Sequence, residues 1–314
     1  MITHYKPRRT SESLWVVARG IRHHIRAWGP VDAPPLWLLH GWMDGSASFQ
    51  FLVDELQIER RIYAPDWRGY GLTERAPGID AYWFPDYLAD LEAMLDALAP
   101  GQPVDLAAHS MGGNIACLYA GVRPSRIRRL VNLEGYGLPG NQPDQAPERY
   151  AQWLDELSKP ERERIWPSLE ALVSRMCRNN PRLGAERATW LAQHWAQAVE
   201  VPAGEAADTD SPSRDAPTIG WQLRGDPAHR RRNPVLYRVE EVLACWRQIT
   251  APVLLVEAGE PDDWHQYTRE PAYRERLAAF PSLQTTTVAG SGHMLHHDQP
   301  EAVARLIESF LGQA

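Results

Sequence analysis

The chain has 314 residues and a formal net charge of −7 at pH 7, with 44% hydrophobic and 23% charged residues. These values are ordinary for a soluble globular protein and exclude disorder as the default. The acidic balance argues against a dedicated nucleic-acid-binding protein. The N-terminus lacks the apolar centre of a signal peptide, and no window predicts a membrane span. Three widely spaced cysteines fit a reducing compartment, so we expect a cytoplasmic protein.

The first part of the chain alternates strand-like and helix-like segments. Residues 14–18 and 21–28 flank Gly20 and predict a hairpin, and the apolar run 35–39 predicts a strand buried on both faces. The segments that follow alternate helix and strand: 46–56, 61–65, 85–98, 103–106, 114–120 and 127–134. This alternation predicts an α/β fold with a mostly parallel sheet and helices on both of its faces.

The rhythm breaks in the middle of the chain. Four helix-like segments occur there without a clear buried strand: 150–157, 169–177, 187–198 and 239–249. A polar stretch at 202–217 predicts a loop. The core pattern then resumes with strands 252–256 and 283–288 and helices 271–280 and 300–311. We therefore expect a core at 1–136, a helical cap at 137–246 and the rest of the core at 247–314.

A sharp strand-to-helix turn centres on Ser110. The stretch from Ala107 to Gly113 has a serine with a small residue two before it, Ala108, and two after it, Gly112. Small residues are required because the backbones on either side of such a tight turn come close together. The turn would expose the Ser110 hydroxyl and point the backbone N–H of Met111 at developing negative charge. A serine here could also be no more than a helix N-cap.

An activated serine needs a histidine base and a carboxylate that orients it. In chain order after Ser110, Asp262 follows one predicted strand and His293 follows the next. Both lie just past the carboxyl ends of strands, where open α/β sheets bind ligands.

Five short motifs in order make the chain resemble the α/β-hydrolase superfamily. They are His40-Gly41-Trp42, Asp66-x-Arg68-Gly69-x-Gly71, His109-Ser110-Met111-Gly112-Gly113, Gly259-x-x-Asp262 and Gly290-Ser291-Gly292-His293. The resemblance implies an α/β-hydrolase fold of about eight strands and a catalytic triad of Ser110, Asp262 and His293. It also implies an oxyanion hole formed by the backbone N–H groups of Trp42 and Met111. A serine at position 110 argues against the dehalogenases and epoxide hydrolases of the superfamily, which use aspartate there.

Several assignments stay open at this point. Asp263 is adjacent to Asp262, and Glu134 follows the strand after the elbow helix, so either could be the acid. His296 and His297 are weaker alternatives to His293 as the base. His40 and His109 could line the pocket or only brace the loops.

The basic cluster at 230–232 is either a solvated face or a contact for an anionic substrate.

The leading hypothesis is a serine hydrolase that cleaves a carboxylic ester of a small, mostly apolar or aromatic substrate. The tryptophans between Trp153 and Trp246 suggest that substrate class. The same triad could serve a thioesterase, a lactonase, a carbon–carbon bond hydrolase or an acyltransferase, and a ligand-binding protein could retain it. No motif predicts a metal, flavin, nicotinamide or nucleotide cofactor, and the oligomeric state is not readable from the sequence.

Overall fold

The core is a single eight-stranded sheet in the order β1-β2-β4-β3-β5-β6-β10-β11. The computed structural model describes residues 4–159, 164–202, 218–260, 262 and 267–313. The strands are β1 Glu12–Ala18, β2 Ile21–Trp28, β3 Pro35–Leu39, β4 Arg61–Pro65, β5 Val104–His109, β6 Ile127–Leu133, β10 Val253–Ala258 and β11 Leu283–Val288. β2 pairs antiparallel with β1 and β4, and the pairs from β4 to β11 are parallel. The prediction of a mostly parallel sheet of about eight strands is confirmed.

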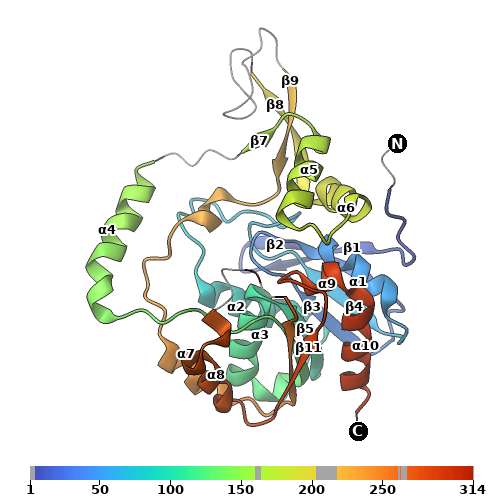
Figure 1. The fold of residues 1–314 in the computed structure, drawn as a ribbon, viewed down its shortest axis with the longest axis vertical. Helices are drawn as coiled ribbons and strands as arrows, with labels where there is room; N and C mark the ends of the chain where they lie inside the picture. Colours follow the sequence, from blue (N-terminus) through green and yellow to red (C-terminus); the bar gives the residue numbers. More distant parts are fainter. Residues whose placement is uncertain (1–3, 160–163, 203–217, 261, 263–266, 314) are drawn as a thin grey trace.

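Helices cover both faces of this sheet (Figure 1). The core helices are α1 Gln50–Glu55, α2 Phe84–Leu98, α3 Met111–Val122, α7 Val239–Trp246, α8 Pro271–Arg276, α9 Leu295–Asp298 and α10 Pro300–Leu311. Leu91 of α2, Ile115 of α3 and Trp246 of α7 belong to one buried cluster, whereas Leu52 of α1 and Ile307 of α10 belong to another. Two apolar cores therefore sandwich the sheet. No helix within the described ranges is long and apolar enough to cross a membrane.

The cap combines helices with a small sheet. Its elements are α4 Ala146–Leu157, β7 Ile165–Trp166, α5 Leu169–Asn179, α6 Ala185–Trp195, β8 Ala196–Val201 and β9 Thr218–Leu223. The three strands form an antiparallel sheet in the order β7-β9-β8. In Figure 1 the three strands of this sheet lie at the top of the view, above the core.

The expectation of an entirely helical cap is therefore wrong. The helix predicted over 187–198 ends at Trp195, and the chain continues directly as β8. β8 and β9 are only partly buried, so they lack the continuous apolar run that marks a core strand. The loop predicted at 202–217 lies almost wholly outside the described residues.

The returning end of the cap docks onto the core through aromatic rings. The imidazole of His229 is stacked between Tyr70 and Tyr82, with ring centroids 3.7 Å away on each side. The Tyr82 hydroxyl donates to Asp226 at 2.8 Å, and the Arg231 guanidinium donates to the Asp80 carbonyl at 2.8 Å. These contacts hold the cap over the carboxyl edge of the sheet.

Candidate active site

Ser110 lies on a strained turn between β5 and α3. Its backbone has φ +52° and ψ −115°, a conformation that non-glycine residues rarely adopt. The backbone N–H of Ser110 donates to the Leu133 carbonyl of β6 at 2.8 Å, which fixes the turn to the sheet. A Cβ at Gly112 would lie 2.3 Å from the Leu39 carbonyl oxygen, so only glycine allows α3 to begin this close to β3.

His293 faces Ser110 from the loop after β11. Its Nε2 lies 2.9 Å from the Ser110 Oγ, within hydrogen-bond reach. The imidazole is 6% exposed, so it is largely shielded from water but accessible from the serine side. Residues 183 positions apart in sequence thus form the nucleophile–base contact that the motifs predict.

Two carboxylates approach His293 in different ways. Glu134 Oε2 lies 3.3 Å from His293 Nδ1, the ring nitrogen that faces away from Ser110. Asp262 Oδ2 instead accepts a hydrogen bond from the His293 backbone N–H at 3.3 Å. Of these two carboxylates, Glu134, the alternative acid, faces the ring, whereas Asp262 meets the backbone of the same residue, so Glu134 is the partner that we take forward as a proposal. Asp263 lies outside the described residues.

Glu134 is held rigidly at the end of β6. Its φ is +62°, and its carboxylate is 4% exposed. Oε1 accepts hydrogen bonds from the Ala258 backbone N–H at 2.6 Å and from the Tyr136 hydroxyl at 2.8 Å. Burial and the neighbouring Glu134 and Glu257 carboxylates raise the pKa of Tyr136, which therefore stays protonated as a donor. With Oε1 occupied, Oε2 is turned towards the imidazole.

The loop after β3 carries the predicted oxyanion donor of Trp42. His40 braces this loop: its Nδ1–H donates to the Gly41 carbonyl at 2.8 Å, and its Nε2 accepts from the Trp67 backbone N–H at 3.0 Å. Burial lowers the pKa of His40, in keeping with a neutral ring that both donates and accepts. The second predicted donor is the backbone N–H of Met111. Met111 is the first residue of α3, where backbone N–H groups lack intrahelical partners.

His40 and His109 are buried rather than exposed to a substrate pocket; their side chains are 0% and 1% exposed. His109 donates from Nε2–H to the His293 carbonyl at 2.8 Å, so it supports the loop that carries the base. Burial, together with the neighbouring His296 and His293, lowers the pKa of His109. His296 lies against His109, with ring centroids 4.5 Å apart, an arrangement that the sequence order did not indicate.

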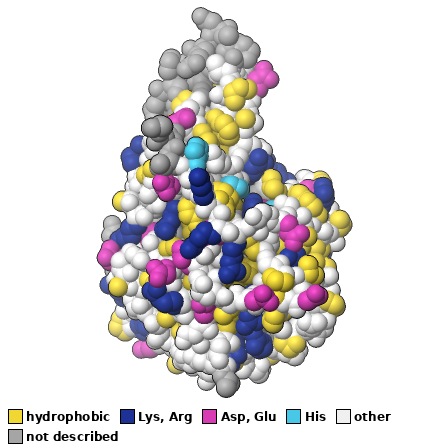
Figure 2. Space-filling view, turned by 90° about the vertical axis from the view of Figure 1, so that its right-hand side faces the viewer, with side chains coloured by type: hydrophobic (Ala, Val, Ile, Leu, Met, Phe, Trp, Pro, Cys, Tyr) yellow, Lys and Arg dark blue, Asp and Glu magenta, His cyan; other side chains and the backbone are white. Residues whose placement is uncertain are grey.

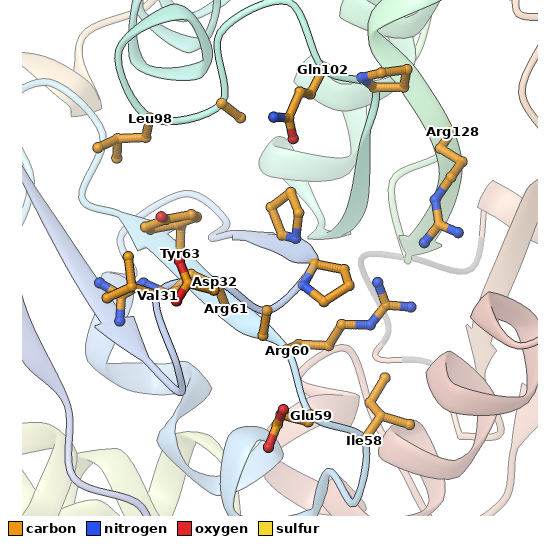
Figure 3. Close-up of a pocket in the computed structure, with 15 residues that line it drawn as sticks. Val31, Asp32, Ile58, Glu59, Arg60, Arg61, Tyr63, Leu98, Gln102 and Arg128 are labelled. Carbon is orange, nitrogen blue, oxygen red and sulfur yellow. The ribbon is translucent and has the colours of Figure 1, made fainter.

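Cavities occur at both edges of the sheet. A small one of about 20 Å³ lies beside the loop after β3 and is lined in part by Met43, Trp195 and Leu223, which brings cap side chains next to that loop. A larger one of about 970 Å³ lies at the amino ends of the parallel strands, with Arg60 and Arg128 on its wall (Figure 3). Ser110 and His293 follow carboxyl ends, so the larger cavity is remote from them.

The basic cluster at 230–232 takes part in contacts between segments. Arg231 reaches Asp80, and the Arg232 backbone N–H donates to Glu156 of α4 at 2.7 Å. These contacts favour a structural role over the recognition of an anionic substrate. Across the face shown in Figure 2, basic and acidic side chains are intermingled.

The model of the alpha/beta hydrolase family matches residues 38–306. The chain belongs to this family. It is similar to a serine hydrolase-like protein of Danio rerio, with 26% identity over 297 residues that cover 91% of this chain and 84% of the relative. It is also similar to the esterase YbfF of Escherichia coli, with 25% identity over 285 residues, or 88% and 92% of the two chains.

Among solved structures, the hypothetical protein PA1622 of Pseudomonas aeruginosa superposes with a TM-score of 0.80 at 28% identity, covering 96% of this chain and 100% of that one. The family and the names of these relatives support hydrolase activity in general.

Proposed function

We propose that this protein is a serine hydrolase that cleaves the carboxylic ester of a small, mostly apolar or aromatic substrate through an acyl-enzyme intermediate. The observation that carries the proposal is the chain of contacts from Ser110 Oγ to His293 Nε2 and from His293 Nδ1 to Glu134 Oε2. A nucleophile, a base and an orienting carboxylate in this order are what acyl transfer needs.

In the first half-reaction, Ser110 Oγ attacks the ester carbonyl carbon and its proton passes to His293 Nε2. The negative charge on the carbonyl oxygen is held by the backbone N–H groups of Met111 and Trp42; a donor of this kind contributes about 3 kcal/mol to transition-state stabilisation. The imidazolium returns its proton to the departing alcohol, which leaves the acyl group on Ser110. Glu134 stabilises the transient positive charge of the imidazolium.

In the second half-reaction, His293 takes a proton from water, and the hydroxide attacks the acyl carbon. Collapse of the second tetrahedral intermediate releases the carboxylic acid and restores the Ser110 hydroxyl. The proposed substrate class rests on apolar side chains that the cap brings next to the loop after β3, where Trp195 and Leu223 lie beside Met43. The cavity between them, about 20 Å³, is too small to be the substrate pocket itself.

We further expect the protein to act in a reducing, cytoplasmic compartment. All three cysteines are free thiols, and burial raises the pKa of Cys117 to about 12, so that this thiol is inert. The free thiols support the expectation of a reducing compartment that was drawn from the cysteine spacing. We expect neither a nucleic acid nor a cofactor as a partner.

The test is covalent labelling by a fluorophosphonate, read by intact mass. The wild type should gain one adduct, whereas Ser110→Ala should gain none and lose hydrolysis of short aryl and alkyl esters by about 10⁴-fold or more. Labelling of Ser110→Ala, or ester turnover that survives the substitution, would contradict the assignment.

Parallel turnover of an ester, a thioester and a lactone with the same acyl group then decides the bond. A thioester or lactone preferred over the ester by a large factor would keep the nucleophile but overturn the ester assignment.

A further inference from the structure

Directly beneath the proposed triad lies a group of three buried side chains that the mechanism leaves unused. Asp44, His109 and His296 each offer a donor atom within 4.8 Å of the other two. Their exposed fractions are 6%, 1% and 0%, respectively. Asp44 follows the oxyanion loop, His109 ends β5, and His296 lies on α9, so three separate parts of the fold converge here.

The imidazoles of this group carry ring nitrogens for which the described part of the chain offers no hydrogen-bond partner. His109 Nδ1 and both ring nitrogens of His296 are buried without one among the described residues. Buried polar atoms are almost always satisfied, because leaving them unpaired costs free energy. Two such nitrogens at one point, His109 Nδ1 and one nitrogen of His296, therefore indicate that something else fills this space.

The protonation state of His109 indicates which kind of species fills this space. Its Nε2 lies 2.8 Å from the His293 carbonyl oxygen, which can only accept, so Nε2 carries the proton and Nδ1 presents a lone pair. A histidine that donates one N–H to a backbone carbonyl and offers its other nitrogen is the arrangement typical of metal-bound imidazoles. The lone pair of His109 is thus fixed in direction by the fold.

The other two side chains complete a set of ligands suited to a transition metal. His296 Nε2 lies 3.8 Å from Asp44 Oδ2, and tetrahedral zinc places its ligand atoms roughly 3.3 Å apart. Small side-chain rotations close that difference. Asp44 is itself oriented by the Ser48 hydroxyl, which donates to Oδ2 at 3.1 Å. Two imidazoles and one carboxylate select zinc and its neighbours over magnesium or calcium, which prefer oxygen ligands.

We propose that Asp44, His109 and His296 form a binding site for a divalent transition-metal ion, and that an ion bound there inhibits the hydrolase. Asp44 also lines the small cavity of about 20 Å³ between the core and the cap. The inhibitory part rests on the proposed function. His109 donates from Nε2–H to the His293 carbonyl oxygen at 2.8 Å, so an ion that draws the His109 ring towards Asp44 and His296 displaces the loop that holds His293 against Ser110.

Binding is tested with Zn²⁺ alone on the chelator-treated full-length protein, by calorimetry, with Co²⁺ absorption as a second probe. We expect one chelator-reversible Zn²⁺ per chain and a visible Co²⁺ spectrum. His296→Leu and Asp44→Asn should each weaken the affinity by roughly tenfold or more. The matched control is His297→Leu. This neighbouring imidazole is also buried, and its Nε2 has no hydrogen-bond partner in the part of the chain that the structure describes, but it lies outside the group of three.

Retention of wild-type affinity in both His296→Leu and Asp44→Asn would overturn the site, as would a wild type that binds no Zn²⁺. Either result would mean that the nitrogens are satisfied by a buried water molecule.

Inhibition is read separately, as ester hydrolysis with and without saturating Zn²⁺. We expect Zn²⁺ to reduce ester hydrolysis and a chelator to restore it. His297→Leu should be inhibited by Zn²⁺ in the same way. Full ester hydrolysis at saturating Zn²⁺ would refute the inhibitory role but not the binding site. Absence of hydrolysis in the metal-free wild type would instead count against the proposed function, because the binding measurement does not depend on it.

Discussion

Glu134 shows how neighbouring groups hold one side chain in the position that its proposed role needs. Hydrogen bonds from the Ala258 N–H and the Tyr136 hydroxyl restrain Oε1, and the positive φ at the end of β6 turns the side chain towards the loop after β11. Asp262 has a shorter side chain and reaches the His293 backbone instead of serving the ring in the same way. Whether a carboxylate orients the imidazole of His293 or anchors its loop therefore depends on which atom of His293 it meets.

The two roles predict different losses on removal of charge. Glu134→Gln should lower kcat/KM by about 10²–10⁴-fold, because the imidazolium loses its counter-charge and the ring its orientation. Asp262→Asn should cost roughly tenfold or less, because an amide oxygen can still accept from the His293 N–H. Steady-state kinetics of both variants against pH checks this, and the pH profile should change in Glu134→Gln alone. The reverse order of losses would restore Asp262 as the triad acid.

The start of α3 against β3 is the element-level feature on which the elbow depends. Gly112 brings the first turn of the helix so close to the end of β3 that a Cβ would overlap the carbonyl oxygens of Leu39 and His40, at 2.3 and 2.7 Å. Both are backbone atoms, one in the last residue of the central strand β3 and the other in the residue that follows it, and they cannot move without disturbing the end of that strand. This contact positions the N–H of Met111 relative to the loop that carries Trp42.

We therefore predict that Gly112→Ala destabilises the protein by about 1–3 kcal/mol, the usual cost of overpacking, despite the better helix propensity of alanine. Urea unfolding measures the change in the free energy of unfolding, and ester hydrolysis should fall with it. Gly225→Ala is the matched control, since its Cβ would meet Met43 Cε at an ordinary 3.7 Å. Equal stability of the two variants would show that α3 adjusts freely.

At the scale of the whole molecule, the cap is fastened to the core by a neutral histidine. Burial lowers the pKa of His229 to about 3, because its ring is enclosed by Tyr70 and Tyr82. Its Nε2–H donates to the Arg68 carbonyl at 3.1 Å, and its Nδ1 accepts from the Tyr87 hydroxyl at 3.2 Å. Because burial of the ring disfavours its charged form, the docked cap holds His229 neutral, with Nδ1 as the acceptor for Tyr87.

This pKa shift predicts how stability depends on pH. An unfolded His229 titrates near 6.5 and the folded one near 3, so the unfolded state binds more protons between these values. The stabilisation is complete above pH 6.5 and declines as the pH falls towards 3, by up to about 1.4 kcal/mol per pH unit. Urea unfolding at several pH values should give a free energy of unfolding that depends less steeply on pH in His229→Gln than in the wild type. Identical slopes would assign the acid sensitivity to other groups.

Local patterns in the sequence were sufficient to predict the sheet of the core and the contact between Ser110 and His293. The alternation of strands and helices, the small residues around Ser110 and the position of His293 after the last strand predicted the sheet and the residues that meet at its carboxyl edge. These features are local because the period of an element and the steric demands of a tight turn are set by neighbouring residues. The small sheet of the cap escaped prediction because its strands are short and half-exposed.

Only the tertiary structure shows which atoms of His293 the Glu134 and Asp262 carboxylates meet, and only it reveals the group beneath the proposed triad. β6 and β10 are neighbours in the sheet, so Glu134 and Asp262 emerge side by side, and the sequence has no means of ranking two acids at the ends of paired strands. Asp44, His109 and His296 are likewise far apart in the chain and meet only because β3, β5 and the loop after β11 end at one edge. Which atoms meet there depends on side-chain directions that are fixed by packing across the whole fold.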